Sequence, residues 1–371
     1  MKRGDTHNFG KHVKNSGSKW LMKPRETFWE KLFLSKSSDF RAHLEEVLVD
    51  EPLMDYLPTL SFRDRLDHKH CTLVEKIVLK QVPIKQLEVD TEFLLEALGG
   101  LFAIMSWFGI GDLHKENIFF GKHASTDKII LTPVDIEFIF KKIYLPTDLG
   151  LLPHADPKLK DISGIKPLEW FIKNSTLKSK LAVIYAYLRV SHRLIKHSNS
   201  VTSTLKHTPG IMNAVIRSAP RHTMDYISFM KSGVSAKLIE NKFAFIEEEL
   251  VQIARGDVPY FFRTLKDSSI KFYSSSDLKK VSLVKNKLWI KSMTAGILQL
   301  DEIFHDKLRR QTLLEYGPLI LAAYFIPADF IGKLRYRNMS LEVSARMIKI
   351  HYRNETNLKG PRSWPELSSP L

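Results

Sequence analysis

The sequence predicts an α+β fold of two parts, in which a small mixed α/β part precedes a larger, mainly helical part. Short β-like runs broken by polar residues fill residues 1–90. A strongly apolar stretch at 91–110 indicates a buried helix, and beyond Gly150 apolar residues recur every three to four positions. The predicted domains are residues 1–90, 91–325 and a C-terminal extension, 326–371.

Two strands are predicted in the first part. LMKPRE at 21–26 reads as a strand that ends at its proline, because proline cannot continue a strand ladder. TLVEKIVLKQV at 72–82 alternates well enough for a second strand.

After the helix at 91–110, two β-like runs flank a polar loop. The first is short, Ile118–Phe120, and the second is IILTPVDIEFIF at 129–140. Polar residues lie just before the first run and within the second, which is the pattern of a site built on a small sheet.

The remaining chain is predicted to be mainly helical. Helical spacing of apolar residues covers 168–195, 236–254 and 314–326. The serine-rich segments 198–203 and 268–277 are predicted loops, and the proline-containing tail after about residue 354 is predicted to be poorly ordered.

Composition limits the class of protein. The single cysteine, Cys71, excludes an intrachain disulfide framework and a multi-cysteine zinc site, and favours a reducing, cytoplasmic location. The N-terminus has no apolar signal region, and the longest apolar stretch is too short to span a bilayer. The net charge of +15 fits anionic ligands such as a nucleotide or an acidic peptide. Nucleic acid is not expected, because the basic residues form no dense block.

A group of oxygen-bearing side chains in the middle of the chain predicts phosphoryl transfer. Asp112 is followed five residues later by Asn117, and Asp135 and Glu137 lie further on. Asp112 would orient or deprotonate a substrate hydroxyl, while Asn117 and Asp135 would bind Mg²⁺ beside ATP, with Glu137 on the same strand face in support. Such a pattern also arises by chance, and His114 within it could be an ordinary loop histidine.

Nucleotide binding also needs a phosphate cradle and a cation. The turn Gly4–Gly10 could offer backbone amides to phosphate, although it is not a Walker A motif. Lys23, on the predicted strand, could reach the phosphates. The alternative for Lys23 is a solvated lysine at a strand edge.

Six motifs, in order over about residues 4–325, resemble the dehydratase domain of type II lanthipeptide synthetases. They are GDTHNFGKHV with WLMKPRE, GIGDLHKENIFF, TPVDIEFIF, GLLP with DISG, RSAPRHTMDY, and GDVPYF. The resemblance implies a lipid-kinase-like two-lobe fold, with an apparently truncated small N-lobe and a large, mainly helical C-lobe. It implies ATP- and Mg²⁺-dependent phosphorylation of Ser and Thr in a precursor peptide, then elimination of phosphate to give dehydroalanine or dehydrobutyrine.

The resemblance also implies residue roles. Lys23 would contact the ATP phosphates, and Asp112, His114 and Asn117 would form the catalytic loop. Asp135 and Glu137 would form the metal-binding segment.

For elimination, the resemblance implies Arg217 and Thr223, six residues apart. A guanidinium can compensate charge on a departing phosphate. Asp5 and His7 match family positions in the glycine-containing turn and could serve either step. Without the resemblance, Arg217 and Thr223 would read as an ordinary helix start. The GDVPYF motif is expected to be a structural turn, with Tyr260 and Phe261 in the core.

Two departures from the family bear on partners. The chain has no Cys/His zinc site for ring closure, so a separate cyclase is expected to act with it. The small-lobe region that precedes the glycine-containing turn in the family is not seen, which leaves a separate N-terminal chain, a reduced lobe or a misplaced gene start. Two other functions stay open: a Ser/Thr kinase without elimination, and a non-catalytic basic scaffold for a peptide or nucleic acid.

Overall fold

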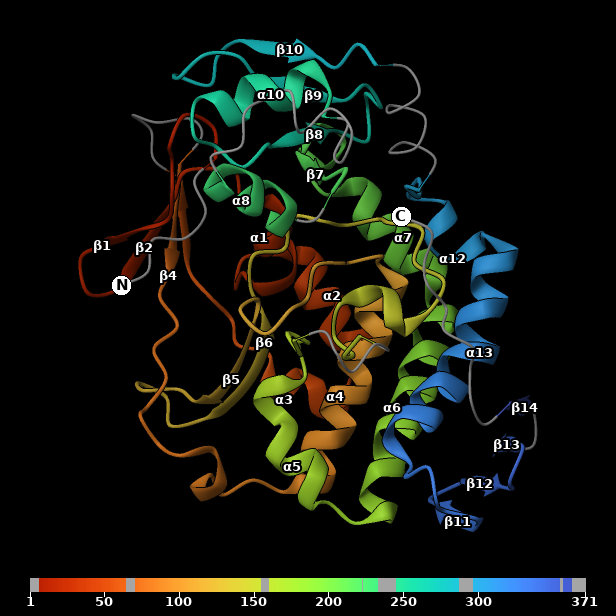
Figure 1. Cartoon of the computed structure of the whole chain (residues 1–371). Coiled ribbons are helices and arrows are strands. Elements are labelled where there is room, and N and C mark those ends of the chain that lie inside the picture. Colours follow the sequence, from red (N-terminus) through yellow and green to blue (C-terminus); the bar gives the residue numbers. More distant parts are fainter. Residues whose placement is uncertain are drawn as a thin grey trace. The chain divides into compact units, whose positions relative to one another are not determined.

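The computed structural model describes residues 7–64, 71–154, 160–221, 223–232, 245–286, 296–353 and 356–361. The fold is mixed α/β, with several small sheets and a larger number of helices (Figure 1). The chain divides into two compact units, each built from separate stretches of sequence, whereas the predicted domains are consecutive. The first unit comprises Met1–Lys31, Leu60–Lys76 and Pro209–Ile297, and the second comprises Leu32–Thr59, Ile77–Thr208 and Leu298–Leu371.

The elements of the first unit are short. They are β1 (Lys14–Ser16), β2 (Trp20–Lys23), β3 (Phe62–Asp64), β4 (Thr72–Glu75), η4 (Ile211–Asn213), β7 (Ile216–Ser218), α8 (Thr223–Ser232), α10 (Glu247–Ala254), β8 (Phe261–Arg263), β9 (Lys271–Tyr273) and β10 (Val281–Leu283). Helix α1 (Phe28–Leu34) spans the boundary between the units.

The second unit holds the long helices. Its elements are α2 (Asp39–Val47), α3 (Pro52–Tyr56), η1 (Ile84–Gln86), α4 (Thr91–Trp107), β5 (Ile118–Lys122), β6 (Ile129–Pro133), η2 (Pro146–Leu149), η3 (Lys166–Leu168), α5 (Glu169–Asn174), α6 (Leu177–Lys196), α7 (Ser198–His207), α12 (Glu302–His305), α13 (Lys307–Phe325), β11 (Gly332–Tyr336), β12 (Met339–Val343), β13 (Met347–Tyr352) and β14 (Thr356–Pro361).

Two antiparallel four-stranded sheets form the first unit, in the orders β1-β2-β4-β3 and β10-β9-β8-β7. Alternation along β8 sends side chains to both faces of the second sheet. Tyr260 and Phe262 pack with Tyr273 on one face, while Phe261 packs with Phe272 on the other. Tyr260 and Phe261 are therefore core residues, as the sequence predicted.

Arg263, at the end of β8, is an unusual member of this core. Only 2% of its surface is exposed. Its Nε and Nη2 have no hydrogen-bond partner within the part of the chain that the structure describes, and burial lowers the pKa of the guanidinium to about 10. Burying a charge without a partner costs free energy, so Arg263 weakens the sheet it belongs to.

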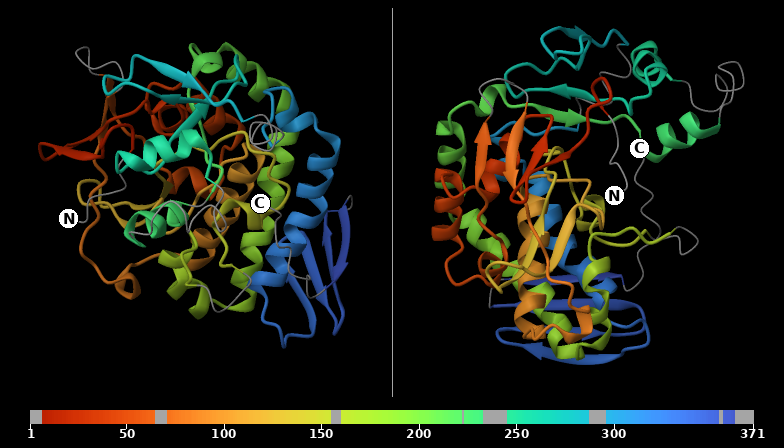
Figure 2. Two further views of the ribbon diagram at one scale, coloured as in Figure 1. Left: turned by 45° about the horizontal axis from the view of Figure 1, so that its top comes forward. Right: turned by 90° about the vertical axis from the view of Figure 1, so that its left-hand side faces the viewer.

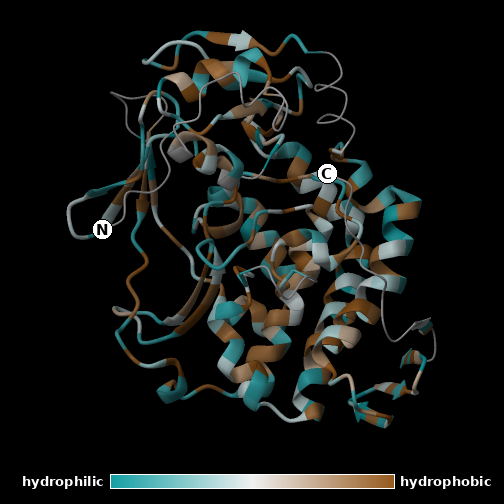
Figure 3. Ribbon diagram, viewed as in Figure 1, coloured by the Kyte–Doolittle hydropathy of each residue, from teal (hydrophilic) through white to brown (hydrophobic). Residues whose placement is uncertain are grey.

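The core of the second unit is the pair α4 and α6. Every residue of α4 from Leu94 to Trp107 is buried, and the helix is mainly apolar along its length (Figure 3). A Cβ at Gly99 would clash with the carbonyl of Val183 on α6, so the absence of a side chain lets the two helices approach closely. The helix predicted at 91–110 is confirmed, and it ends three residues earlier, at Trp107.

A buried ionic network joins four elements of the second unit. Arg189 on α6 donates to Glu51, at the N-cap of α3, and to Glu96 on α4, each at 2.7 Å through Nη2. The Tyr336 hydroxyl on β11 donates to Glu96 at 2.6 Å and to Glu92 at 2.9 Å. The network attaches the antiparallel sheet β11-β12-β13-β14 to the helices, and Figure 2 shows that sheet beside α13.

Several predictions from sequence need correction. The serine-rich segment 198–203 is helical, because Val201 and Thr202 are buried and support α7. The predicted helix at 168–195 is broken where Thr176 caps α6. Of the tail predicted to be poorly ordered after about residue 354, residues 356–361 form β14, and 362–371 lie outside the described residues.

Other predicted elements are partly observed. The strand predicted at 72–82 is shorter, since β4 ends at Glu75. The predicted loop 268–277 contains strand β9. The predicted helix at 236–254 is seen only as α10, because 236–244 lie outside the described residues, and the prediction at 314–326 corresponds to α13. No helix in the described ranges combines the length and apolarity needed to cross a membrane.

Candidate functional site

The loop Asp112–Asn117 is held by main-chain hydrogen bonds to three other segments of the second unit. The amide of Gly111 donates to Phe138, that of Leu113 to Leu149, and that of Lys115 to Ile162, at 2.8–3.2 Å. These bonds use backbone atoms of the partner segments, so they fix the path of the loop and leave its side chains to other roles.

Side chains within the loop also contact one another. Asn117 Nδ2 donates to the Asp112 carbonyl at 2.8 Å, and the amide of Glu116 donates to His114 Nδ1 at 3.3 Å. His114 Nε2 lies 3.3 Å from Asn117 Nδ2 and 3.9 Å from Asp112 Oδ1. His114 is thus oriented toward the carboxylate predicted to act on a hydroxyl.

The hairpin of β5 and β6 brings Asn117 close to Asp135. Ile118 pairs with Pro133, and the amide of Val134 donates to the carbonyl of Asn117 at 2.8 Å. Asn117 and Asp135 therefore flank the open end of the hairpin, although Asp135 comes 18 residues after Asn117 in the sequence. Asp112 and Asp135 both have positive φ, 63° and 64°, which sets them apart from the regular strands.

The prediction that Asp135 and Glu137 share one face of a strand is wrong. Strand β6 ends at Pro133, and the left-handed backbone at Asp135 breaks the alternation. Glu137 is 7% exposed.

The oxygen donors of Asn117, Asp135 and Glu137 are of the type that Mg²⁺ prefers. The Asn117 amide nitrogen is used within the loop, so the oxygen is the atom suited to a metal. Across the described residues, no three His, Cys, Asp or Glu side chains cluster closely enough to hold a metal by themselves. The donor chemistry of Asn117 and Asp135 fits a metal that is also bound by a nucleotide and water, rather than one enclosed by protein.

In the first unit, Lys23 forms a buried ion pair. Its Nζ lies 2.9–3.0 Å from both carboxylate oxygens of Glu30, and the two side chains are 8% and 3% exposed. Arg25 Nη2 donates to the same carboxylate at 2.9 Å. The alternative of a solvated strand-edge lysine is therefore wrong. A strand lysine paired with a glutamate on the following helix is the arrangement that kinases use beside ATP phosphates.

His7 and Arg217 both contact the ring of Tyr260. The His7 and Tyr260 ring centroids are 5.7 Å apart, and the Arg217 guanidinium lies 5.2 Å from the centre of the Tyr260 ring. His7 Nδ1 donates to the carbonyl of Val258 at 2.8 Å, so Nε2 is the basic nitrogen of the neutral ring. His7 and Arg217, which are 210 positions apart in the sequence, thus share one tyrosine.

The turn that contains His7 is fixed by Asp257. The amides of Phe9 and Gly10 donate to the two carboxylate oxygens of Asp257, at 2.6 and 2.8 Å, and Asp257 is fully buried. The expectation that this turn offers its amides to phosphate does not hold for these two positions, because a carboxylate already occupies them. The GDVPYF motif anchors the turn.

Two predicted residues are not fully described. Asp5 lies outside the described residues, and Thr223 is the first residue of α8, with its side chain not described. Helix α8 is attached to α10 through Glu249, which accepts from Arg221 Nε at 2.9 Å and from the Tyr226 hydroxyl at 2.6 Å. Burial and the Glu249 carboxylate raise the pKa of Tyr226.

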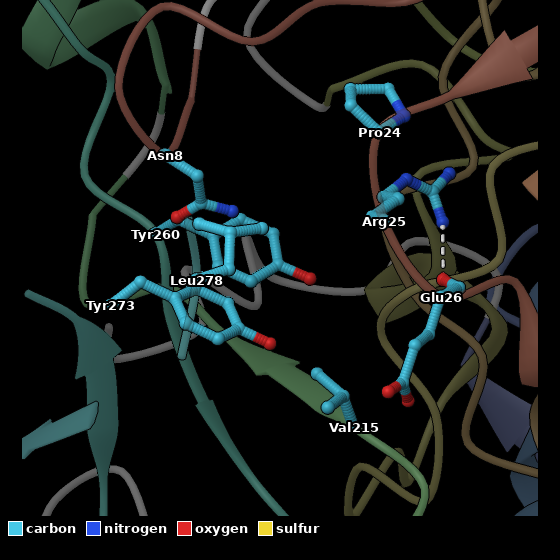
Figure 4. A pocket seen from close by; sticks show the side chains of 8 residues that line it. All are labelled: Asn8, Pro24, Arg25, Glu26, Val215, Tyr260, Tyr273 and Leu278. Atoms are coloured by element: carbon cyan, nitrogen blue, oxygen red, sulfur yellow. Dashed lines mark hydrogen bonds between the residues drawn. The ribbon is translucent and has the colours of Figure 1, made fainter. Parts of the chain in front are cut away.

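A small pocket in the first unit adjoins these residues. Figure 4 shows the hydroxyls of Tyr260 and Tyr273 directed into it, with Arg25 and Glu26 across from them. The enclosed space, about 10 Å³, is enough for one water molecule. Burial raises the pKa of the Glu26 carboxyl.

Glu30, Tyr260 and Asp257 were not predicted as parts of a site. Glu30 lies seven residues after Lys23 across a strand-to-helix turn, and only the first-turn position of an acidic residue could have indicated it. Asp257 and Tyr260 act on a turn about 250 residues earlier in the chain, which no local pattern reveals.

No protein-family model matches this chain, and no curated protein is significantly similar to it. The function is therefore inferred from the residues of the chain and their geometry.

Proposed function

We propose that the protein is a kinase-like Ser/Thr dehydratase, which uses ATP and Mg²⁺ to phosphorylate a precursor peptide and then eliminates the phosphate. The observation that carries the proposal is the convergence of Asp112, Asn117 and Asp135 at the end of the β5–β6 hairpin. The buried Lys23–Glu30 pair supports it. A lipid-kinase-like two-lobe arrangement is part of the same proposal.

In the phosphorylation step, Asp112 accepts the proton of the substrate hydroxyl as its oxygen attacks phosphorus. The bond between phosphorus and the ADP oxygen breaks, and ADP leaves with the electron pair. Lys23, oriented by Glu30, steadies the nucleotide phosphates. Asn117, Asp135 and Glu137 would hold Mg²⁺, which when bound neutralises phosphate charge. His114 orients the Asp112 carboxylate.

In the elimination step, a base takes the α-proton of the phosphorylated residue, the Cα–Cβ double bond forms, and the Cβ–O bond breaks as phosphate leaves with the electron pair. Arg217 compensates the charge of the departing phosphate, with Thr223 positioned at the start of α8 to assist. His7, whose Nε2 is the basic nitrogen, is the described candidate base, and Asp5 is the other.

A precursor peptide is the proposed substrate, and a separate cyclase the proposed partner for ring closure. A thermal shift with ATP and Mg²⁺ tests whether this chain binds the nucleotide. Cytoplasmic location belongs to the same proposal, because both ATP and the ribosomal peptide are made there.

The test is mass spectrometry of a Ser/Thr-containing precursor peptide incubated with the protein, ATP and Mg²⁺. We expect a product lighter by one water per modified residue. Arg217→Ala should convert it to a product heavier by one phosphate. A wild-type product that keeps phosphate would instead identify a kinase without elimination. If neither product forms and ATP with Mg²⁺ gives no thermal shift, the remaining hypothesis is a non-catalytic basic scaffold for a peptide or nucleic acid.

A further inference from the structure

Lys141 lies beside the Asp112 loop, although no sequence pattern assigned it a role. Residues 140–141 pair with 108–109 through main-chain hydrogen bonds of 2.9 and 3.0 Å. A Cβ added to Gly111 would lie 3.5 Å from Lys141 Nζ, so the ammonium rests against the residue that precedes Asp112. The ammonium is also 5.6 Å from the centre of the Phe138 ring.

The charge of Lys141 is not neutralised by a close carboxylate. In the described ranges its ammonium has no hydrogen bond or ion pair, and the carboxylates that attract it at longer range are Asp112 and Asp148. Dense protein on one side lowers the pKa of its ammonium, and the attraction of Asp112 and then Asp148 opposes that effect. The side chain nevertheless reaches solvent.

An exposed lysine could simply be hydrated. Lys141 differs in that its stem lies along Gly111, the residue before Asp112, and its ammonium faces the Phe138 ring. Asp112, the carboxylate predicted to act on the hydroxyl, attracts that ammonium. A cation kept there can compensate charge that develops on a phosphoryl group transferred to that hydroxyl. A lysine acts as a flexible point charge, which suits a group that moves during transfer.

We propose that Lys141 binds the oxygens of the phosphoryl group that is transferred at Asp112. This inference rests on the proposed function, because it assigns Lys141 to the phosphorylation step. It assigns no role to Lys141 in the elimination step. The ligand chemistry is a phosphoryl oxygen, which either the ATP γ-phosphate or the newly phosphorylated side chain could supply.

The first experiment compares Lys141→Met with Lys142→Met, a matched change at the adjacent lysine. We expect Lys141→Met to lower kcat for phosphorylation by on the order of 10²-fold, the usual effect of removing one transition-state donor. Lys142→Met should stay within about threefold, as expected for a surface change. Lys141→Arg should restore much of the activity, since it returns the positive charge. Equal activity of the two Met variants would overturn the proposal.

The second experiment uses the wild-type chain and needs no turnover. A neutral acylating reagent reacts with unprotonated amines, and the extent of labelling at each lysine is read by peptide mass spectrometry. We expect a non-hydrolysable ATP analogue with Mg²⁺, or phosphoserine peptide, to protect Lys141 and leave Lys142 unchanged. The two ligands distinguish the two sources of phosphoryl oxygen.

The two experiments separate failure of this inference from failure of the proposed function. If the wild type phosphorylates the peptide but neither ligand protects Lys141, the assignment of Lys141 is wrong and the proposed function stands. If the wild type shows no ATP-dependent product and inorganic phosphate also fails to protect Lys141, both are wrong. Protection by inorganic phosphate without turnover would support an anion site at Lys141 and contradict the kinase reaction.

Discussion

The candidate residues of the two units are positioned in different ways. In the first unit, Lys23 and Glu30 are 8% and 3% exposed, and their charges are paired with each other. In the second unit, the Asp112 and His114 side chains are 48% and 31% exposed, and the loop that carries them is held by main-chain bonds. The residues of the first unit are fixed by pairing of their side chains, and those of the second unit by main-chain hydrogen bonds of their loop.

This difference separates stability from activity. Removing a buried partner leaves an uncompensated charge, so changes in the first set should unfold the protein as well as inactivate it. The loop in the second unit should tolerate side-chain changes without loss of stability, because its path depends on backbone groups.

The largest effect is expected from Asp112→Asn. Asparagine tolerates the positive φ of this position, so we expect an unchanged melting temperature and a loss of phosphorylation on the order of 10³-fold. Asp127→Asn is the matched control, because Asp127 also has positive φ, 61°, and lies in the β5–β6 loop. A lowered melting temperature in Asp112→Asn alone would show that the carboxylate is structural.

Glu30→Gln should act mainly on stability. It removes the charge that neutralises Lys23, and we expect the free energy of unfolding to fall by about 3 kcal/mol, as for a broken buried ion pair. Glu169→Gln is a suitable control, since Glu169 also lies in the first turn of a helix but forms exposed ion pairs with Lys166 and Lys173. Its effect should stay below about 1 kcal/mol. Equal losses of unfolding free energy in the two variants, measured by urea unfolding, would contradict the expected difference between buried and exposed ion pairs.

Tyr336→Phe extends the test to a buried pairing that includes no candidate site residue. Loss of the hydrogen bonds to Glu92 and Glu96 should lower the free energy of unfolding by about 1–2 kcal/mol. Tyr324→Phe, at a side chain that is 40% exposed, should have little effect.

The raised pKa of Tyr336 predicts that the stability of the protein depends on pH. Burial, and then the two carboxylates, raise the pKa of Tyr336 above the ordinary 10.0. The folded state therefore keeps a proton that the unfolded state loses, and stability should fall as the pH rises above about 10. In Tyr336→Phe, melting temperatures between pH 9 and 11 should fall less steeply; an unchanged slope would contradict this role.

The smallest effect, and opposite in sign, is expected from Arg263→Met. Two nitrogens of this buried guanidinium have no partner in the described part of the chain, so an apolar side chain of similar length should raise the free energy of unfolding by about 1 kcal/mol. Arg335→Met, on an exposed strand position, should change it by less than about 0.5 kcal/mol. A destabilised Arg263→Met would indicate that an anion or water pairs with the guanidinium.

Local pattern was sufficient to predict some of this structure. The apolar runs that form α4, β5 and β6 were recognised in the sequence. A continuous apolar segment is buried as a helix or a strand, so few other structures fit it. Asp112, Asn117 and Asp135 were predicted from their spacing and from the resemblance, and the β5–β6 hairpin brings Asn117 close to Asp135. The strand alternation assumed for Glu137 was wrong because it depends on the backbone at Asp135, and aspartate adopts a left-handed conformation only in some contexts.

Tertiary packing decided the rest. Segment 198–203 has the composition of a loop, yet burial of Val201 makes it part of a helix. The pairing of Tyr260 with His7, and of Asp257 with Phe9, joins residues about 250 positions apart, so neither is visible in any window of sequence. Glu30 was missed because its importance comes from a lysine on a strand rather than from its own neighbours.

The main-chain hydrogen bonds that hold the Asp112 loop have an evolutionary consequence. Carbonyl groups at Phe138, Leu149 and Ile162 support the loop, and every amino acid carries such a group. Substitutions at these three residues would leave the hydrogen bonds to the loop intact as long as the backbone keeps its path. Descendants of this protein could therefore drift far in sequence around the loop while the few acidic and amide side chains it presents stay in place.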